Sequence, residues 1–582
     1  MFQFRFLWKN LKGRRWMVIV GMMISAITSM IVIINPYMSK ILVDDVIKGG
    51  KRDWLIPVLL IMCGVVLTRT VLRYLMINLL EWSSQHMIVN IRKALFENLQ
   101  YQEMRFFDRN RTGDIITRVT GDLDYLRHTV AWITYMLTDA VVTFLSAVIF
   151  LFYVSVPLTL SLLAVLPFLI LVSIFYSKKV RPLYRDIRFR LSQVNVAAQE
   201  NIAGNRVVKA FAREEYEKKK FLEKSEEFRQ AHLKAAYAWQ KIVPVIEFFA
   251  QLLTFITLLV GGFLVIQGDI TLGELTLFTG LTWALAMPMR NISGLLNDLQ
   301  RFFAAADKVI EVYYAKPTIV DRHDAVSLEG RMKGKIEFKN VSFKYTDEKV
   351  LNNISFTAQP GQTIAIMGPT GCGKTTLVNL ISRFYDATEG KILLDDVDVR
   401  MRKLSDIRKS IGVATQDVFL FSDTVDGNIS FGDPDMPQEQ TYYYASAACA
   451  DGFIRKMEEG YDTIIGERGV GLSGGQRQRV ALARAMAVKP PILILDDTTS
   501  AVDMETEKEI QKNIRELPFD CTKIIIAQRI SSVRHADCIY ILENGSIQAG
   551  THDQLARTNK YYREVCELQD VANLPEFEGG EL

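Results

Sequence analysis

The segment Gly368-Pro369-Thr370-Gly371-Cys372-Gly373-Lys374-Thr375 follows directly after the apolar run Ile364-Ala365-Ile366-Met367. It has the pattern GxxxxGK[ST], which forms a phosphate-binding loop where it joins a strand to a helix. The glycines let backbone N–H groups surround the phosphates, the lysine meets their β/γ charge, and the threonine hydroxyl holds Mg²⁺. We therefore predict a nucleotide site that includes Gly368, Thr370, Gly371, Cys372, Gly373, Lys374, Thr375 and Thr376.

Two segments further along the chain belong to the same chemistry. Pro491-Ile492-Leu493-Ile494-Leu495-Asp496 is typical of a buried strand that ends in a carboxylate, where a second magnesium ligand completes a phosphate site. Leu472-Ser473-Gly474-Gly475-Gln476 opens a helical run, and N–H groups at a helix start bind anions. This anion site lies too far along the chain from the phosphate-binding loop to serve it.

The region around these motifs has the pattern of an α/β domain. After Ala306, strands such as Gly334 to Phe338 alternate with glycine turns and helices. We expect a linker over residues 316–333 and a nucleotide-binding α/β domain over residues 334–572. Residues 573–582 form an acidic tail that we expect to be frayed.

The first half of the chain has a different composition. Of 582 residues 49% are hydrophobic and 23% charged, with a mean hydropathy of +0.12, which excludes extended disorder and argues against an ordinary soluble enzyme. The apolar residues concentrate before about residue 300, in stretches near the roughly 20 residues that cross a bilayer as a helix. Six such spans are predicted: Trp16 to Ile34, Trp54 to about Leu79, Ala131 to Ser155, Leu158 to Tyr176, Ile242 to Ile266, and Glu274 to about Leu296.

Basic residues predict the orientation of these spans. Arg5, Lys9, Lys12, Arg14 and Arg15 place the N-terminus in the cytoplasm, because lysine and arginine next to a span stay on that side. The short turns Val156-Pro157 and Gln267 to Gly273 carry neither residue type and are expected outside. Loops 80–130 and 178–241 are charged, with helical periodicity, so we expect helices that continue into the cytoplasm.

Several charged residues fall within the spans. We expect Arg73 to reach the inner interface, whereas Arg69, Asp139, Glu247 and Arg290 are candidates for lining a polar cavity between helices. Prolines within three spans remove helical hydrogen bonds, so kinks are expected at Pro167, Pro244 and Pro288.

The overall charge and the cysteines exclude other classes of protein. The 69 Lys+Arg against 65 Asp+Glu give a net charge of +4, too balanced over this length to indicate a nucleic-acid partner. The cysteines show no zinc-ligand spacing and are typical of reduced cytosolic thiols; they are Cys63, Cys372, Cys449, Cys521, Cys538 and Cys566.

Taken together, these motifs resemble a half-transporter of the ABC exporter type, in which a membrane domain is fused to one nucleotide-binding domain. The resemblance covers nearly the whole chain: an α-helical polytopic membrane domain with six transmembrane helices and two long intracellular loops over residues 1–315, then the α/β P-loop ATPase domain. It implies ATP and Mg²⁺ as cofactors. The implied metal ligands are Thr375, Gln416 and Asp496.

The same resemblance assigns further segments. It implies that Tyr345 stacks on adenine, that Gln416 is the Q-loop residue, and that Ser500 to Asp503 is the D-loop. Leu472 to Gln476 resembles the signature motif, through which Ser473, Gly475 and Gln476 bind the γ-phosphate held by a partner chain. Residues 1–13 resemble an interfacial elbow helix. Four further segments resemble the family's intracellular coupling segments: Phe106-Phe107-Asp108, Thr112-Gly113-Asp114-Ile115, Asn201-Ile202-Ala203-Gly204 and Val208-Lys209-Ala210-Phe211.

Two departures from the family pattern lie where the γ-phosphate would be. The family's catalytic glutamate is replaced by Asp497, one methylene shorter, and its H-loop histidine by Gln528, which hydrogen-bonds but carries no positive charge. A misplacement of roughly 1 Å at a reacting centre costs about a hundredfold in rate. Asp497 and Gln528 thus predict a site that binds ATP and hydrolyses it slowly. Thr498 also replaces the usual proline.

An intact signature beside an impaired site favours one half of a heterodimer, whose partner has the complete glutamate and histidine. The implied activity is ATP-driven export of amphipathic small molecules, drugs or lipids, through a bacterial inner membrane, with the nucleotide domain and both termini cytoplasmic. The expected partners are the second half-transporter and the lipid bilayer. No nucleic-acid partner is expected. A homodimeric exporter and a nucleotide-gated regulatory or channel-like subunit remain open as alternatives, and the identity of the substrate also remains open.

Overall fold

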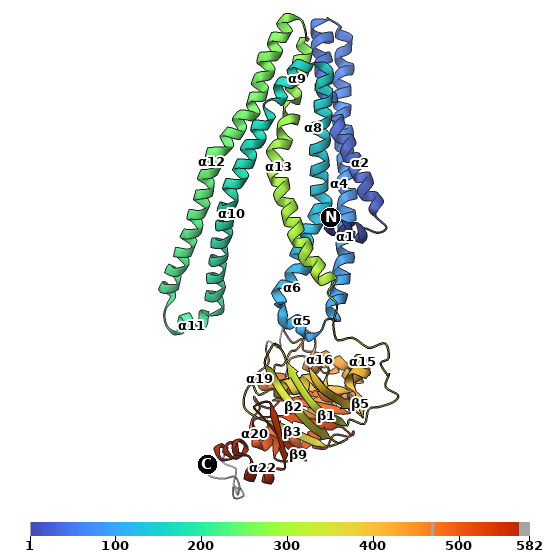
Figure 1. Cartoon of the computed structure of the whole chain (residues 1–582), viewed down its shortest axis with the longest axis vertical. Coiled ribbons are helices and arrows are strands. Elements are labelled where there is room, and N and C mark those ends of the chain that lie inside the picture. Colours follow the sequence, from blue (N-terminus) through green and yellow to red (C-terminus); the bar gives the residue numbers. More distant parts are fainter. Residues whose placement is uncertain (1, 467–468, 470, 570–582) are drawn as a thin grey trace. The chain divides into compact units, whose positions relative to one another are not determined.

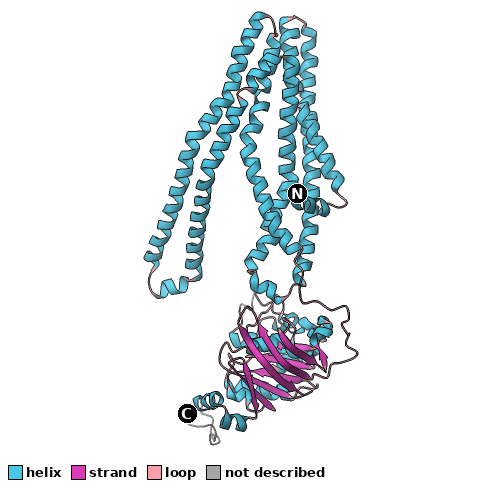
Figure 2. Ribbon diagram, in the orientation of Figure 1, coloured by secondary structure: helices cyan, strands magenta, loops and turns pink. Residues whose placement is uncertain are grey.

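The computed structural model describes residues 2–466, 469 and 471–569. The chain divides into two compact units. The first comprises residues 1–101 and 110–315, and the second comprises residues 102–109 and 316–582. Figure 2 shows that strands occur in the second unit, whereas the first is built of helices. The predicted acidic tail lies outside the described residues.

The first unit consists of long helices joined by short turns (Figure 1). Its α-helices are α1 (Phe2–Asn10), α2 (Arg15–Ile31), α3 (Ile34–Ile41), α4 (Leu55–Gln100), α6 (Thr112–Val119), α7 (Gly121–His128), α8 (Thr134–Val154), α9 (Val156–Leu163), α10 (Leu166–Ala203), α11 (Asn205–Ala210), α12 (Glu214–Gln267) and α13 (Leu272–Tyr313). π-Helical turns follow α3 at Leu42–Lys48 and precede α8 at Thr129–Ile133, and a 3₁₀ turn at Arg52–Trp54 leads into α4.

Five helical segments of the described chain are long and apolar enough to cross a bilayer, and each coincides with one predicted span to within a residue or contains it. They are Arg15–Lys48, Arg52–Gln100, Thr112–Val154, Val156–Ala203 and Glu214–Gln267.

The sixth predicted span lies within α13 but is not among the five segments that meet the membrane-span measure. The charged Glu274 and Arg290 bound its most apolar part, which lowers its hydropathy. Helix α13 nevertheless packs against α8, α10 and α12 as part of the same bundle.

The charged loops form helices, as expected, because α4, α10 and α12 run without a break into them. Pro167 lies at the start of α10, and the chain breaks its helical path between α9 and α10 at Ala164 and Val165. Pro244 and Pro288 lie inside the continuous helices α12 and α13. Of the three prolines, Pro167 therefore coincides with an interruption of the helix.

The short turn before α13 is fixed by a capping box. The Thr271 hydroxyl accepts from the backbone N–H of Glu274 at 3.0 Å, and the Glu274 carboxylate accepts from the Thr271 N–H at 2.9 Å. Both bonds satisfy N–H groups that have no partner inside the helix. Asp44 adds a further bond, accepting from the N–H of Gly273 at 2.8 Å.

The N-terminal helix α1 lies within residues 1–13, for which an interfacial elbow helix was predicted. Phe6 and Leu7 are buried, and the Phe6 ring packs edge-on against Tyr313 of α13 with centroids 4.9 Å apart. Phe2 and Phe4 remain exposed. The Phe4 ring still contacts Phe302 of α13, with centroids 5.1 Å apart, so both buried and exposed apolar residues of α1 pack toward α13.

Two sheets organise the second unit. The first is antiparallel, in the order β2-β1-β4-β5, and the second has the order β10-β9-β3-β8-β7-β6, parallel except for the hairpin β9-β10. The strands are β1 (Ile336–Lys344), β2 (Lys349–Ala358), β3 (Thr363–Met367), β4 (Glu389–Leu394), β5 (Val397–Asp398), β6 (Ile411–Ala414), β7 (Ile492–Asp496), β8 (Thr522–Ile526), β9 (Cys538–Glu543) and β10 (Ser546–Gly550).

The second unit also contains helices, as the α/β pattern predicts. They are α14 (Lys374–Ile381), α15 (Leu404–Lys409), α16 (Val425–Ile429), α17 (Gln438–Ala447), α18 (Asp451–Ile454), α19 (Gly474–Ala487), α20 (Met504–Arg515), α21 (Ile530–Val533), α22 (His552–Thr558) and α23 (Lys560–Leu568). Strand β3 is buried on both faces: Ile364 and Ile366 join the core shared with the antiparallel sheet, while Ala365 and Met367 join a core that includes Tyr562 of α23. This alternation follows from the two-residue period of a strand.

The predicted coupling segment Phe106-Phe107-Asp108 lies in α5 (Met104–Arg109). Helix α5 belongs to the second unit, although the rest of that unit begins only at Lys316. The Tyr385 hydroxyl donates to the Asp108 carboxylate at 2.6 Å. Glu103 accepts from the backbone N–H groups of Thr318 and Ile319 at 2.9 and 3.1 Å. These bonds attach the segment to the nucleotide domain.

Gly412 of β6 provides a test of this packing. A Cβ atom at Gly412 would lie 2.3 Å from the carbonyl oxygen of Ala485, so Gly412→Ala is expected to destabilise the domain by about 1–3 kcal/mol through overpacking. Thermal unfolding of the purified protein measures the effect. Gly452→Ala is the matched control because a Cβ there meets nothing within 4 Å, and an equal loss in both variants would contradict the prediction.

Candidate functional site

The phosphate-binding loop joins β3 to the start of α14. Gly368 has φ +152° and a Cβ atom there would lie 2.1 Å from the carbonyl oxygen of Leu542, so only glycine fits. Gly373, at φ +105°, precedes α14 and turns the backbone into the helix. The Lys374 ammonium donates to the carbonyl oxygens of Gly368 and Pro369 at 2.8 Å each, which holds the cation over the loop.

The remaining polar groups come from the carboxyl ends of neighbouring parallel strands. Asp496 ends β7, Gln416 follows β6, and Gln528 follows β8, next to β3 in the sheet order. Parallel strands place all their carboxyl ends at one edge, which is where α/β sheets bind ligands. One cleft is therefore lined by groups from four strands.

Thr375 and Asp496 are directly joined. The Thr375 hydroxyl donates to the Asp496 carboxylate at 2.9 Å, and Asp496 is almost fully buried. Burial raises the pKa of the Asp496 carboxyl above its ordinary value, the bond from Thr375 opposes this, and the nearby negative charge of Asp497 adds to it. A hydroxyl, a carboxylate and the amide oxygen of Gln416 are oxygen donors of the kind Mg²⁺ prefers, so these residues fit a magnesium ion.

Tyr345 also lines the cleft. Its ring packs edge-on against Phe343 and Tyr385, with centroids 4.8 and 5.2 Å away, and its hydroxyl lies 3.2 Å from that of Thr376. The ring is about one-third exposed. An aromatic ring held in place and still accessible is suited to stacking on a planar base.

The cleft brings together eleven of the predicted site residues: Tyr345, Thr370, Gly371, Gly373, Lys374, Thr375, Thr376, Gln416, Asp496, Asp497 and Gln528. Gly368 and Cys372 belong to the loop but do not line the cleft. Val350, Ile526 and Ala527 also line it and were not predicted. Val350 lies in β2, where the sequence carries no motif that distinguishes it from a core valine.

The signature residues lie away from this cleft. Ser473 caps α19, and it forms a capping box with Gln476: the Ser473 N–H donates to the Gln476 side chain at 2.9 Å, and the Ser473 hydroxyl accepts from the Gln476 N–H at 3.3 Å. Ser473 is exposed and Gly475 partly so. Asp503 caps α20 by accepting from the Thr506 N–H at 2.9 Å, and it too lies outside the cleft.

Asp497 and Gln528, the two departures, both line the cleft. Asp497 has φ +50°, a left-handed conformation that costs about 1–3 kcal/mol for a residue other than glycine. Its N–H donates to the Ile526 carbonyl at 2.8 Å, which fixes it against β8. Strained residues held by their surroundings occur at functional sites.

Family comparisons agree with this architecture. The sequence model of the ABC transporter transmembrane region matches residues 18–289, and the model described as ABC transporter matches residues 351–500. An uncharacterised ABC transporter ATP-binding protein of Bacillus subtilis (strain 168), YknU, is 35% identical over 97% of this chain and 96% of its own length. The chain belongs to the ABC exporter family.

Further relatives cover the exporter almost entirely. The putative multidrug export ATP-binding/permease protein YgaD of Bacillus subtilis (strain 168) is 34% identical over 95% of this chain and 97% of its own length. The ATP-dependent lipid A-core flippase of Syntrophus aciditrophicus (strain SB) is 35% identical over 90% of this chain and 88% of its own length. The solved structure of a bacterial Atm1-family ABC exporter with ATP bound covers 97% of this chain and 100% of its own, with a TM-score of 0.80 and 25% identity.

These relationships establish that the exporter spans a membrane and that its second unit is an ATP-binding domain of an ATP-hydrolysing transporter. The fold class predicted from the sequence is confirmed: a helical membrane domain followed by a nucleotide-binding α/β domain. The roles of individual site residues stay predictions.

Because the pKa of Asp496 is raised, we expect the Mg²⁺-dependent affinity for ATP to depend on pH. Its carboxylate has to be ionised to bind a metal, so Mg²⁺-dependent ATP affinity is expected above this pKa and is lost as the pH falls through it. Asp497→Asn removes a like charge, lowers the pKa of Asp496 and moves the loss to more acid pH. Binding of a fluorescent ATP analogue between pH about 4 and about 8 measures the midpoint.

The matched control is Asp417→Asn, because the charge of Asp417 also raises the pKa of Asp496 but contributes less than that of Asp497. A smaller shift in the same direction is expected. A shift toward higher pH in Asp497→Asn would contradict the assignment of Asp496 as the titrating ligand.

Proposed function

We propose that this chain is the slowly hydrolysing half of a heterodimeric exporter that uses ATP to move amphipathic small molecules out of the bacterial inner membrane. The observation that carries the proposal is the presence of both Asp497 and Gln528 in a cleft whose phosphate loop is otherwise complete. Such a cleft retains the groups that bind ATP and Mg²⁺ and lacks those that activate water. A partner half-transporter then supplies the fast site.

The slow site follows from the chemistry of the two side chains. An aspartate reaches one methylene less than glutamate, and a displacement of roughly 1 Å at a reacting centre costs about a hundredfold in rate. Glutamine at position 528 donates and accepts hydrogen bonds but neither carries charge nor relays a proton. Both changes act on the same phosphoryl group, so they lower the rate of ATP hydrolysis and leave the affinity for ATP unchanged.

Surfaces on both units support an obligatory second chain. Ser473 and Gly475 lie outside this chain's own cleft, which leaves the anion site at the start of α19 for another nucleotide. In the first unit, the turn at α11 exposes Ile202, Val207 and Phe211, which are 77%, 62% and 74% accessible. Large apolar side chains gathered at one turn favour a protein contact.

A groove in the membrane unit supports an amphipathic, anionic substrate. Arg69 and Arg73 lie one turn apart on α4 and line a groove whose other walls are mostly apolar, with Ile31, Val32 and Val66 among them. No described residue forms an ion pair with either arginine, although the Arg73 guanidinium lies 5.7 Å from the centre of the Tyr135 ring. Unpaired cations between apolar walls suit a lipid or drug with a negative headgroup.

The other charged candidates have partners. Asp139 accepts from the Ser29 hydroxyl at 2.6 Å, and Glu247 of α12 pairs with Arg290 of α13 at 3.4 Å. These side chains therefore serve contacts between helices. The relatives named a lipid A-core flippase and a multidrug exporter agree with a lipid or drug substrate for this chain.

The heterodimer predicts that this chain, purified alone, has little ATPase activity, because its own site lacks a complete base and no fast site is present. The chain carrying an affinity tag is purified from cells that produce no other half-transporter, and from its native cells. The native preparation should hydrolyse ATP at least about a hundredfold faster. Robust, cooperative hydrolysis by the chain alone would replace the heterodimer with a homodimer, and ATP-gated transport without any hydrolysis would favour a gated channel.

A substitution in the signature segment is expected to affect ATP turnover in the partner's site and not nucleotide binding in this chain's own cleft. Ser473→Arg places a bulky side chain at the start of α19, so the partner's turnover should fall by roughly a hundredfold or more, as for loss of a donor to a transferring group. Photolabelling of this chain by an ATP analogue should be unchanged, because Ser473 does not line its own cleft. Normal turnover together with lost labelling would place the signature in this chain's own site.

A further inference from the structure

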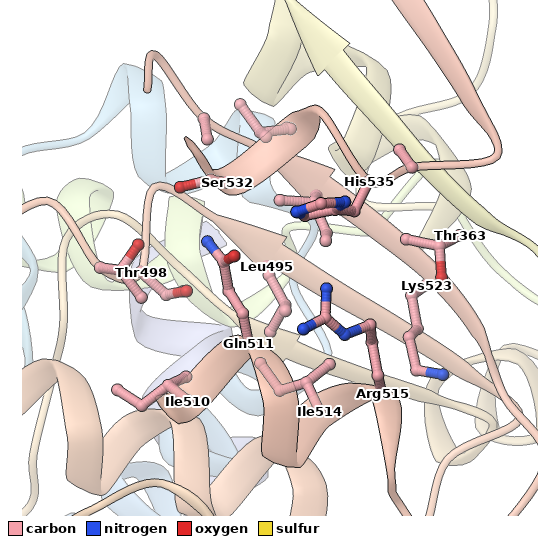
Figure 3. A pocket seen from close by; sticks show the side chains of 15 residues that line it. Thr363, Leu495, Thr498, Ile510, Gln511, Ile514, Arg515, Lys523, Ser532 and His535 are labelled. Atoms are coloured by element: carbon pink, nitrogen blue, oxygen red, sulfur yellow. The ribbon is translucent and has the colours of Figure 1, made fainter. Parts of the chain in front are cut away.

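A cavity other than the nucleotide cleft lies between α20 and the parallel sheet (Figure 3). Apolar side chains of three elements form most of its lining: Leu495 of β7, Ile525 and Ile526 of β8, and Ile510 and Ile514 of α20. Its space is about 620 Å³ when the part open to solvent is included, which is within the range of small-molecule sites. Protein interiors are otherwise closely packed, so a space of this size calls for an explanation.

Basic side chains gather at this cavity. Arg515 ends α20, Lys523 lies in β8, His535 follows α21, and all three residues line the cavity. Figure 3 shows the Arg515 guanidinium extending toward the His535 ring. Two cations and an imidazole from three different elements therefore meet around one mostly apolar space.

Lys523 is the least expected of these three residues. It lies in β8, an interior strand between β3 and β7, and is 9% exposed. The two-residue period of a strand places its side chain on the same face as Ile525, which also lines the cavity. Lysine is almost never buried to this extent unless it is paired. Within the described ranges, however, the Lys523 side chain has neither an ion pair nor a hydrogen bond, so its charge is available to an added anion.

Arg515 and His535 also have no acidic partner among the residues that the structure describes. Partial burial lowers the pKa of the His535 imidazole, and the positive charges of Arg534 and Arg515 lower it further. The imidazole is therefore mostly uncharged at neutral pH, and its N–H can donate a hydrogen bond. Both side chains are exposed, so the open side of the cavity has an excess of positive charge.

The carboxylates beside the cavity are engaged elsewhere. Asp537 accepts from the backbone N–H of Thr363 at 2.7 Å. Glu507 accepts from Arg529 at 2.7 Å and from Gln511 at 3.2 Å. In the part of the chain that the structure describes, neither carboxylate pairs with a cation of the cavity, so these cations remain available to a ligand.

The cavity adjoins the nucleotide cleft without being part of it. Ile526 and Ala527 line both spaces, whereas Lys374 lines only the cleft and Arg515 only the cavity. No residue of the phosphate-binding loop lines the cavity. A molecule in the cavity therefore leaves the groups that bind phosphates free.

We propose that this cavity binds a small organic anion, a carboxylate on an apolar body of about one ring, while the neighbouring cleft holds ATP. The carboxylate accepts from the Arg515 guanidinium and the His535 N–H, and the charge of Lys523 compensates its own. The apolar body lies against Ile514 and Ile525. A planar guanidinium suits a carboxylate because two of its N–H groups can donate in parallel. This inference depends neither on a second chain nor on the rate of hydrolysis.

Binding of a fluorinated aromatic acid to the full chain in lipid nanodiscs tests the proposal. The probe is para-trifluoromethylbenzoate, whose binding is followed by fluorine NMR, and its neutral isostere is para-trifluoromethylbenzamide. The benzoate should bind saturably and at least about tenfold more tightly than the benzamide, because hydrogen bonds to a charged group are roughly twice as strong as neutral ones. Equal affinities, or no saturable binding of the benzoate, would overturn the proposal.

Arg515→Gln tests the contact with the carboxylate. The guanidinium is lost and a polar side chain is kept, so the affinity for the benzoate should fall about tenfold or more and that for the benzamide should change little. The matched control is Lys512→Gln, because Lys512 is an exposed basic residue in the same last turn of α20 and does not line the cavity. An equal loss in Lys512→Gln would assign the effect to the general charge of the helix end and would reject the site.

Ala536→Leu tests the apolar part of the site. Ala536 lines the cavity and not the nucleotide cleft, and leucine occupies space that the ring of the probe needs. The affinities for the benzoate and the benzamide should both fall by about tenfold or more, whereas photolabelling by an ATP analogue should be unchanged. An unchanged affinity for the benzoate would place the probe outside the cavity.

Lys523→Met distinguishes a ligand-binding lysine from a structural one. Methionine keeps an unbranched side chain and removes an unpaired buried charge, so the Tm of the unliganded protein should rise while the affinity for the benzoate falls. A structural lysine would give a lower Tm and an unchanged affinity, which would contradict its part in the site.

ATP distinguishes the cavity from the cleft. The benzoate should still bind when ATP is saturating, because Arg515, Lys523 and His535 do not line the cleft. An affinity for the benzoate that falls in proportion to the concentration of ATP would place the probe in the nucleotide cleft and overturn the proposal.

Discussion

The hydrogen bond from Thr375 to Asp496 joins groups from two strands of the sheet at the metal-facing part of the nucleotide site. Thr375 is the second residue of the helix after β3, Asp496 ends β7, and β8 lies between the two strands. The distance between the Thr375 hydroxyl and the Asp496 carboxylate therefore depends on the register in which β3, β8 and β7 pair. The buried ladder of isoleucines in β3, β7 and β8 supplies that register, so the metal-facing groups depend on the core rather than on any loop.

The sequence predicted the parts of the site that lie on one motif. Strand β3 has the predicted bounds, because its apolar run ends at the glycine that must turn, and the carboxylate of Asp496 lies where a buried strand ends. The long helices were also predictable, since the helical period of apolar residues continues from the spans into the charged loops. In each case a local pattern and the final structure depend on the same few residues.

Contacts between distant segments were not predictable. Glu507 and Arg529 are 22 residues apart, on α20 and after β8, and nothing in either segment indicates that they pair. The attachment of residues 102–109 to the nucleotide domain through Tyr385 is of the same kind. Helix α13 was predicted as a span although Glu274 and Arg290 lower its hydropathy, and it packs against α3, α8, α10 and α12.

The strain at Asp497 links these observations. A left-handed aspartate at the end of a buried strand persists where its surroundings fix it, and here the Ile526 carbonyl and the Gln478 side chain both bond to its backbone. Gln478 belongs to α19, which begins after the Ser473 cap, so one side chain joins the backbone of Asp497 to the helix that the signature opens.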